Sequence, residues 1–461
     1  MVLFPLIANA KGIEIDGLKF DVVNKTKEAT VTGLNASVFV GTDVVIPETV
    51  TYEDVSYVVK RIGDNAFYNL RGMTSVSIPR SINSIGKSAF GYCGGLKAVY
   101  ITDIGAWCKI IFNDSPLRWA KHLYLNGEEV KTVVLPNDLK KVNAIVFNGC
   151  ASLEKVVLHD SIDEIGNGAF LDCINLKTIE IPNSVKVIEA WAFGRSGLTS
   201  IVIPNSVYTI GDYVFSGCSS LSSVQLPNTI TSIGKEWFEE CTNLTSVNIP
   251  ETVSTIDVMA FYKCTNLLSI NLHENIKKIS ENSFGYCSSL QSVSIPNQIE
   301  TIEEGAFRGC SSITSVVIPE CLTNIPKNLF RGCTNLKEVY LHSNVKQISS
   351  YAFGWCESLS DVFCHAETPP TCEEKVFYNS YIDYTKLHVP SSSIIIYKET
   401  EPWKSFGDVV AMTDTGIDGT KKTTEQVISH YTLEGRLISA PIKGINIIRM
   451  SNGKTKKIFV K

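Results

Sequence analysis

Cysteine and histidine are the residues of this sequence whose chemistry is easiest to recognise. The chain has 14 Cys and 7 His among 461 residues. The closest grouping is Cys364-His365-x6-Cys372, which lacks a fourth ligand for tetrahedral zinc, and no Cys-x-x-Cys pair occurs in the sequence. We therefore expect no metal site. A local disulfide between Cys364 and Cys372 is favoured instead if the chain reaches an oxidising exterior.

Patterns for catalysis are also weak. The sequence has no phosphate-binding glycine loop and no nucleophile elbow. Near Trp107 and Trp119 the acids that could act are Asp114, Glu128 and Glu129, and none has an evident partner. We expect no enzyme and no cofactor. An enzyme with its site in this segment is the least favoured alternative.

The cysteines instead follow a regular period. Seven cysteines follow one another at intervals of 23 residues, as do Cys150 and Cys173; the seven are Cys218, Cys241, Cys264, Cys287, Cys310, Cys333 and Cys356. The phenylalanines share this period, with one 22-residue step between Phe193 and Phe215. The repeated unit is C-x-x-L-x-x-V-x-I-P-x-x-V-x-x-I-x-x-x-A-F-x-x-C. A fixed period of this length is typical of solenoids and other repeat architectures.

Each unit has the pattern of one solenoid coil. Val293 and Ile295 alternate as in a strand, and Pro296 ends it by removing a backbone donor. Ala306 and Phe307 bring further apolar groups inward. Because one unit cannot bury its own apolar side chains, we predict a β-rich solenoid whose coils stack into a parallel sheet. About twelve coils at the usual strand spacing of roughly 4.8 Å would span on the order of 60 Å.

The repeat gives the cysteines and three histidines a structural interpretation. We expect the ten repeat cysteines to be small, buried, free thiols, because stacked side chains would point in parallel rather than toward one another. Disulfides and a metal cluster remain the alternatives. His159, His273 and His342 occupy the position of the strand-ending Pro, so we expect structural roles for them.

The unit L-x-S-V-x-I-P-x-S-V-x-x-I-G-x-x-A-F-x-G-C-S-S resembles the BspA-like leucine-rich repeats of bacterial surface proteins. The resemblance covers residues 46–362. Residues 103–136 are similar to an insertion that often interrupts these arrays, and residues 364–406 to their closing unit. We assign residues 363–412 to a C-terminal capping unit. The resemblance implies a non-enzymatic surface protein that adheres to host matrix proteins, host cells or other bacteria.

The insertion, residues 103–136, contains a helical pattern and a turn. Ile104, Trp107, Cys108 and Ile111 would share one helical face, and Asn126-Gly127 is typical of a tight hairpin. We expect a packed bulge on the solenoid. The alternative is a recognition knob that exposes Trp107 or Trp119.

The two ends of the chain differ in composition from the repeats. Residues 1–10 are apolar and end in Ala-Asn-Ala, which indicates the remnant of a signal peptide, with a disordered N-terminus as the alternative. Residues 11–45 contain short alternating runs and predict a β cap. The sequence has no run of 18 apolar residues, so it predicts no membrane span.

Residues 413–461 are predicted to form a linker and a small β module. The pattern Y-x-L-x-G-R…P-x-K-G-I-x-I-I-R-x-x-x-G-x-T-x-K-x-x-V-K resembles the C-terminal sorting domain of proteins exported by the type IX secretion system. This tail is basic, whereas the whole chain carries a formal charge of −5. We expect no nucleic-acid partner, because lysine-rich edges also keep small sheets from pairing.

The outward strand positions are the broadest candidate binding surface. They are small, polar and nearly uncharged, which suits a flat protein or glycan surface better than a charged ligand. The candidates on this face are Ser223, Gln225, Ser246, Asn248, Ser269, Asn271, Ser292, Ser294 and Tyr340. A ladder of mutually bonded hydroxyls is the structural alternative. The candidate aromatic residues are Trp107 and Trp119 of the insertion, with Tyr92, Tyr286 and Trp355 on the turns, where packing between coils is the structural alternative.

The sequence therefore predicts a secreted or cell-surface monomer that binds protein ligands on host or neighbouring bacterial cells. A surface glycan-binding protein that serves nutrient capture is the alternative. Stacked repeats create a broad surface without requiring a catalytic pocket. Exposed aromatic side chains on which a sugar could stack would favour the glycan-binding alternative.

Overall fold

The computed structural model describes residues 10–35 and 41–412, together with the backbone of four strands between residues 427 and 460. The chain divides into two compact units, Met1–Val410 and Ala411–Lys461. Most of the expected signal remnant, residues 1–9, and the expected linker, residues 413–426, lie outside the described residues. No helix in the described part is both long and apolar enough to cross a membrane.

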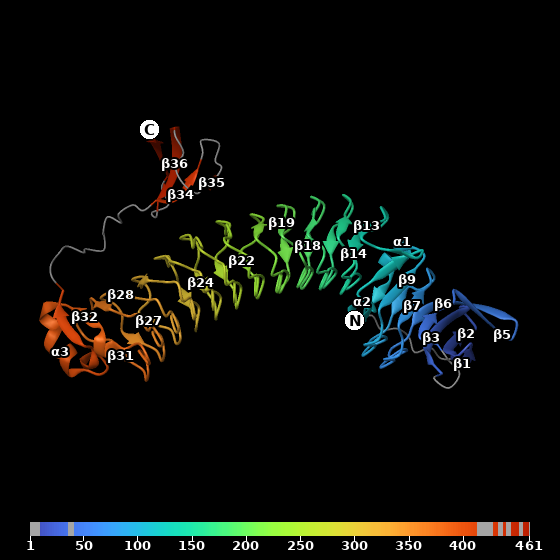
Figure 1. The fold of residues 1–461 in the computed structure, drawn as a ribbon, viewed down its shortest axis with the longest axis horizontal. Helices are drawn as coiled ribbons and strands as arrows, with labels where there is room; N and C mark the ends of the chain where they lie inside the picture. Colours follow the sequence, from blue (N-terminus) through green and yellow to red (C-terminus); the bar gives the residue numbers. More distant parts are fainter. Residues whose placement is uncertain are drawn as a thin grey trace. The chain divides into compact units, whose positions relative to one another are not determined.

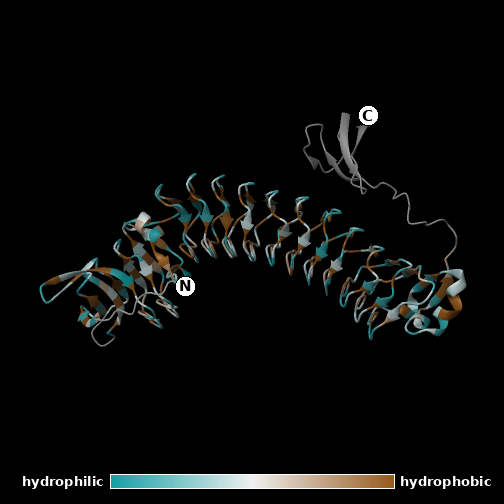
Figure 2. Cartoon of the chain, turned by 180° about the vertical axis from the view of Figure 1, so that it is seen from behind, coloured by the Kyte–Doolittle hydropathy of each residue, from teal (hydrophilic) through white to brown (hydrophobic). Residues whose placement is uncertain are grey.

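The first unit is a parallel-strand β-solenoid, as the repeat predicts, with its coils side by side (Figure 1). It has about 15 stacked turns, more than the twelve expected, because the insertion and the closing segment also form turns. Each regular coil contributes up to two short strands. Equivalent residues 23 apart are paired, as Val316 is with Val339. Hydrophobic and hydrophilic segments alternate within the coils (Figure 2).

The first strand of each coil comes from the S-V-x-I segment. These strands form four parallel groups, of which the first ends in an antiparallel hairpin. They are β4 (Asp43–Val45), β7 (Ser75–Ile78), β9 (Ala98–Ile101), β11 (Leu123–Leu125) and β12 (Glu128–Glu129); β13 (Thr132–Val134), β15 (Lys155–Val157) and β17 (Thr178–Ile179); β19 (Ser200–Val202) and β21 (Ser223–Gln225); β26 (Ser315–Val317), β28 (Glu338–Leu341), β30 (Asp361–Cys364), β32 (Lys386–Val389) and β33 (Asp408–Ala411).

The second strand of each coil lies just before the Phe turn. These strands are two residues long and stay paired even between residues 226 and 314, where the first strands are absent. They are β14 (Lys141–Val142), β16 (Glu164–Ile165), β18 (Val187–Ile188) and β20 (Thr209–Ile210); β22 (Ser232–Ile233), β23 (Thr255–Ile256), β24 (Lys278–Ile279) and β25 (Thr301–Ile302); β27 (Asn324–Ile325), β29 (Gln347–Ile348) and β31 (Thr371–Cys372).

An antiparallel meander covers the beginning of the stack. Its three strands are followed by a hairpin, and the resulting sheet continues into the second-strand positions of the first coils. The strands are β1 (Ala10–Ile15), β2 (Leu18–Val23), β3 (Glu28–Leu34), β5 (Thr49–Tyr52), β6 (Val55–Ile62), β8 (Ser84–Ile85) and β10 (Ile111–Phe112). Strand β2 pairs antiparallel with β3, whereas β3 pairs in parallel with β6. The parallel pairing of the solenoid therefore begins between β3 and β6.

The insertion forms a turn of the solenoid rather than a bulge upon it. Strand β10 pairs in parallel with β8, and β11 with β9. Helices α1 (Ile104–Lys109) and α2 (Leu117–Ala120) connect them. Asn126 and Gly127 have φ of 52° and 89° and form the turn between β11 and β12. Ile111 was wrongly expected on the helical face, because α1 ends at Lys109 and Ile111 lies exposed in β10.

Short helices follow the last coils, and the second unit is a separate sheet. The helices are η1 (Ile382–Tyr384), η2 (Ser391–Ser393), α3 (Ile394–Glu399) and η3 (Trp403–Ser405). The second unit has an antiparallel sheet in the order β35-β34-β36-β37, in agreement with the strands expected in the tail. These strands are β34 (Val427–Tyr431), β35 (Leu437–Ile438), β36 (Gly444–Met450) and β37 (Thr455–Val460).

A column of phenylalanines runs through the core. Neighbouring rings stack with centroids 5.2–5.9 Å apart in two runs that the insertion separates. The rings belong to Phe67 and Phe90, and then to Phe147, Phe170, Phe193, Phe215, Phe238, Phe261, Phe284, Phe307, Phe330, Phe353 and Phe377. Every regular coil therefore buries a large ring against its equivalents, which no single unit could do.

The repeat cysteines form a second column beside the rings. All ten are buried and free. The thiol of Cys264 donates to the carbonyl of Phe238, 3.0 Å away, and Cys287 donates likewise to Phe261 at 3.1 Å. Burial raises the pKa of the Cys218 thiol to about 11 and that of Cys333 to about 12. These are structural groups with little thiolate at neutral pH.

A ladder of backbone hydrogen bonds joins the Phe turns of most coils. The N–H groups of the Phe and of the residues two before and two after it donate to the next coil. Around Phe284 the bonds run from Asn282 to Glu304 (3.1 Å), from Phe284 to Ala306 (2.9 Å) and from Tyr286 to Arg308 (2.6 Å). At the insertion, the carboxylate of Asp114 accepts from the Phe90 N–H at 2.8 Å, in place of a carbonyl. Burial raises the pKa of Asp114 at this position.

The Phe column and the small buried residue directly before each Phe, which in several coils is Ala, predict opposite effects of two substitutions. Phe307→Ala should lower the free energy of unfolding by about 3–5 kcal/mol, because it leaves a cavity between two stacked rings. Ser283 lies where neighbouring coils have Ala260 and Ala306, and its buried hydroxyl has no hydrogen-bond partner in the described residues. Ser283→Ala should therefore raise that free energy by roughly 1–3 kcal/mol.

Equilibrium denaturation of the full chain would measure both changes. Ala306→Ser is the matched control for Ser283→Ala and should destabilise, because it buries a new hydroxyl in the same column. A negligible cost for Phe307→Ala would contradict the register of the coils.

The cysteine column predicts a particular pattern of thiol reactivity. In the folded protein at pH 8 a thiol reagent should modify the exposed Cys321 first. The ten repeat thiols should react only after unfolding, because burial both blocks access and raises their pKa. The measurement is thiol titration with and without denaturant, in the absence of reductant. Five or more disulfides in the unreduced protein would instead favour a cross-linked framework.

Candidate binding surface

The strand face is the outward side of the first strands and of the equivalent segments between them. Its eight predicted Ser, Asn and Gln side chains are all exposed. No hydrogen bond joins any two of them within the described residues, so the structural alternative, a ladder of mutually bonded hydroxyls, does not form there. The hydroxyls that do bridge coils lie one residue earlier, as in Ser222, which donates to the Thr199 carbonyl at 3.1 Å. The side chains of the strand face thus keep their donors and acceptors for solvent or a partner.

The same face carries a row of exposed valines. Val134 pairs with Val157, and Val202 and Val317 occupy equivalent positions farther along. These four side chains are 38–66% exposed. Between β17 and β19, which are not paired, a pocket of about 390 Å³ opens beside Val202 and is lined also by Glu180. Glu180 separates Val157 from Val202, and Gln225, Asn248, Asn271 and Ser294 occupy this position between Val202 and Val317, so the row consists of separate apolar groups on a polar face that a partner would cover.

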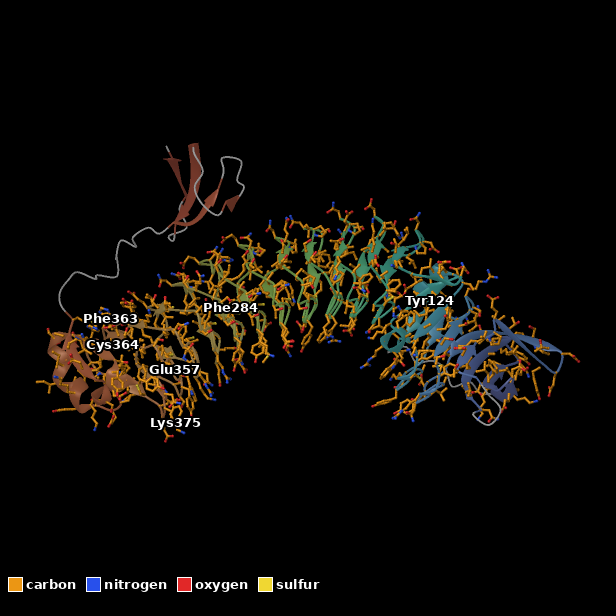
Figure 3. The ribbon with its side chains drawn as sticks, in the orientation of Figure 1. Tyr124, Phe284, Glu357, Phe363, Cys364 and Lys375 are labelled. Atoms are coloured by element: carbon orange, nitrogen blue, oxygen red, sulfur yellow. The ribbon has the colours of Figure 1, made fainter. Side chains whose placement is uncertain are left out.

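Stacked aromatic rings lie at both ends of the strand face. Tyr100 and Tyr124 stack at 5.0 Å, and Tyr340, Phe363 and His388 form a triple stack at 4.6 and 4.3 Å. Figure 3 labels Tyr124 and Phe363, which lie toward opposite ends of the stack of coils. Of these residues only Tyr340 was predicted from the sequence. The alternating runs A-V-Y-I, L-Y-L and D-V-F-C were the available signal, but they lie next to breaks in the period.

Charged groups surround the triple stack. Glu338 accepts a hydrogen bond from the Tyr340 hydroxyl at 2.9 Å. Burial is the main cause, and this carboxylate the second, that raises the pKa of Tyr340 to about 12. Asp361 lies 2.8 Å from Nε2 of His388. Burial tends to raise the pKa of Asp361, but the His388 and Ser360 hydrogen bonds outweigh it, and the net shift is downward. These contacts fix the rings in one orientation.

A second surface, the turn edge, consists of two corner positions in each coil. The first corner is two residues before the Phe and the second is two residues after it. All of them have positive φ. The first corners are Asn65, Ser88, Ile145, Gly168, Trp191, Tyr213, Glu236, Met259, Asn282, Gly305, Asn328, Tyr351 and Lys375. The second corners are Asn69, Tyr92, Gly149, Asp172, Arg195, Gly217, Glu240, Lys263, Tyr286, Gly309, Gly332, Trp355 and Asn379.

Aromatic rings at these corners are mostly covered by cations. Arg308 lies 5.4 Å from the ring centroid of Tyr286, and Arg331 lies 4.3 Å from that of Trp355. Corner residues Trp191, Tyr213 and Tyr351 are covered in the same way. Packing and cation–π contacts between coils therefore account for the predicted site residues Tyr286 and Trp355. Tyr92 differs, because no cation covers its ring among the described contacts.

Trp107 was wrongly considered a candidate for exposure on a recognition knob. It is buried, and its Nε1 donates to the carbonyl of Val146 at 3.2 Å, which anchors the insertion to the next coil. Trp119 is partly buried and has its ring 6.5 Å from that of Tyr92. The insertion does contain one His–acid pair, since Nδ1 of His122 lies 2.6 Å from Glu129. His122 is exposed and Glu129 is partly exposed, as in an ordinary surface ion pair.

The other residues with recognisable chemistry have structural partners. His159, His273 and His342 each bond a backbone carbonyl through Nε2, at 2.9, 3.0 and 3.3 Å. Burial lowers the pKa of His342 and of His365.

The disulfide expected between Cys364 and Cys372 is not formed in the structure. Both are free thiols, and Cys364 instead lies 3.1 Å from the hydroxyl of Tyr397. No cluster of three metal-ligating side chains occurs in the described part of the chain. Cys364 and Cys372 therefore belong to no metal-binding cluster within the described residues.

Comparison with known proteins identifies the repeat. The family model for the BspA type leucine rich repeat region matches residues 48–113, 119–198, 188–297 and 277–400. A leucine rich cell surface protein from Faecalibacterium prausnitzii is similar in structure, with 26% identity over 77% of this chain and 94% of that one and a TM-score of 0.54.

The pneumococcal vaccine antigen PcpA has the same fold, with 20% identity over 88% of this chain and 99% of that one and a TM-score of 0.52. No match was found among curated proteins. Because the family model covers most of the chain and the coils have the predicted register, the chain belongs to the BspA type leucine rich repeat family.

Proposed function

We propose that this chain is a non-enzymatic, secreted or cell-surface binding protein whose strand face contacts protein partners on host or neighbouring bacterial cells. The observation that carries the proposal is the row of exposed valines, flanked by unpaired hydroxyl and amide side chains. An apolar row with a polar surround is the usual composition of a protein-binding surface. The similar F. prausnitzii protein is described as a cell surface protein, which supports the location.

The face offers anchoring points for a flat protein partner. The pocket beside Val202 could receive one partner side chain, and its Glu180 gives that contact a polar neighbour. The aromatic stacks at the two ends add rigid rings, which are common at the energetic centres of interfaces. Face-to-face stacking leaves mainly ring edges outward, so these rings suit a protein better than the face of a sugar.

Charge substitution along the valine row tests the proposal. The triple variant Val157→Glu, Val202→Glu and Val317→Glu should bind partner cells or matrix proteins at least tenfold more weakly than the parent chain. The thermal stability should change little, because all three side chains are exposed. Binding of the immobilised full chain to matrix proteins, whole cells and a glycan panel would be measured in parallel.

The matched control is a triple glutamate variant on the turn edge, Asn65→Glu, Ser88→Glu and Asn379→Glu, which makes the same change in charge at three exposed corners and should leave protein binding unchanged. Equal loss in both variants would indicate a non-specific charge effect. Binding confined to soluble glycans, with no protein or cell bound, would contradict the proposal and favour nutrient capture.

We further propose that the second unit directs export, with cleavage of the leader near Ala10. The support is the resemblance of the tail to a type IX sorting domain, together with its antiparallel sheet. After Gly416 the tail has nine Lys or Arg and three Asp or Glu, so its charge of about +6 differs from that of the solenoid. Because this basic module is separate from the strand face, it is suited to recognition by the export machinery, while the strand face binds the ligand.

Deletion of residues 416–461 should trap the protein in the periplasm, because the solenoid would lose its export signal. Fractionation of a host that has this secretion system, followed by surface labelling, measures the distribution. Thermal stability of the truncated chain serves as the control for folding. Normal surface display without the tail would exclude a sorting role.

A further inference from the structure

The turn edge contains one aromatic site that differs from all its equivalents. Six corner residues are aromatic, and five of them have a cation over the ring. The exception is Tyr92, which is 59% exposed and whose partner ring is Trp119 of α2. The other five corner aromatics can therefore be compared with Tyr92, because an Arg or Lys side chain covers each of those rings.

Tyr92 and Trp119 border a pocket of about 410 Å³ whose other lining residues are Arg71, Gly94 and Gly95. The two rings are 6.5 Å apart and tilted by 35°, so they do not cover each other as a parallel stack would. Tyr68 meets Tyr92 edge to face at 5.4 Å and helps to fix its ring. The pocket therefore presents aromatic surface that none of the described residues covers.

Arg71 supplies the polar component. Its Nε donates to Oδ1 of Asn69 at 3.0 Å, which orients the guanidinium plane. No carboxylate lies within ion-pair distance of Arg71 in the described residues. Arg195 on the same edge differs, because it is paired with Asp172 at 2.7 Å. The remaining guanidinium donors match the two oxygens of a carboxylate.

The glycines keep the pocket open. A Cβ on Gly95 would lie 2.0 Å from the Arg71 carbonyl, so only glycine fits there. A Cβ on Gly94 would meet no atom within 4 Å, so its bare backbone leaves free space in the pocket. A side chain at Gly94 would fill this space without disturbing the coil.

We propose that this pocket binds a pyranose that carries a carboxylate, such as a uronic or a sialic acid residue of a glycan. The C–H face of the sugar packs on Tyr92 and Trp119, its carboxylate pairs with Arg71, and its hydroxyls stay in water because the pocket is shallow. A hydrophobic ligand would lack a partner for Arg71, and a neutral sugar would leave the guanidinium without its anion. The site is separate from the strand face and does not depend on the function proposed for that face.

Titration calorimetry and saturation-transfer NMR on the full chain test the site with four probes. These are methyl glucuronide, its methyl ester, the methyl glycoside of N-acetylneuraminic acid and an acidic peptide of equal charge. At least one carboxylated sugar should bind at least tenfold more tightly than the ester. Arg71→Gln should remove that difference, because the ester and the acid then meet the same neutral side chain.

Gly94→Val should abolish sugar binding with unchanged thermal stability, and Trp119→Ala should weaken it tenfold or more. Arg331→Gln, which alters a covered corner cluster, is the matched control and should have no effect. The two carboxylated probes distinguish uronic from sialic acids. Equal binding of acid and ester, binding that survives Gly94→Val, preference for the peptide, or no binding by either carboxylated sugar would each overturn the proposal.

Discussion

Every part of the solenoid depends on the return of the chain to the same register in each coil. The parallel ladders, the stacked phenylalanines and the thiol-to-carbonyl bonds all join residues in adjacent coils. A coil that failed to return would lose all three contacts at once. The sharp turn around the Phe makes this return possible, because residues at both corners adopt positive φ while the alternate N–H groups still reach the next coil. For residues other than glycine this conformation costs energy, which the stacking must exceed.

This constraint divides the coil into positions that vary freely and positions that do not. Most corner side chains are at least partly exposed, so Asn, Gly, Tyr, Trp, Lys and Glu all occur there. The Phe and Cys columns scarcely vary, and where Ser380 replaces the cysteine its hydroxyl makes the equivalent bond to the Phe353 carbonyl at 2.6 Å. Partner recognition can therefore diverge on the strand face and the turn edge while the core is kept.

Departures from the period coincide with the surface features that could be specific to this protein. The turn shortened by one residue needs Gly197, where a Cβ would lie 2.0 Å from the Ile174 carbonyl. Beside this turn lie β17 and β19, which do not pair with each other, and the pocket between them. The insertion interrupts the Phe column, and Asp114 completes the backbone ladder that would otherwise end at Phe90. The same insertion brings Trp119 to Tyr92. A repeat array thus acquires distinct sites where its repetition fails.

The sequence by itself determined the period, the parallel strands, the buried cysteine and phenylalanine columns and the polar character of the strand face. These follow from local alternation and from spacing, because identical units that stack must align identical residues. Only the tertiary structure decided that Trp107 is buried and that Tyr100, Tyr124, Phe363 and His388 extend the strand face. It also decided that, within the described part of the chain, Tyr92 is the corner aromatic without a cation over its ring. These residues lie at or beside breaks in the period, where spacing no longer specifies the neighbour. Their surroundings depend instead on contacts between segments of unlike sequence, which only the packing of the whole stack defines.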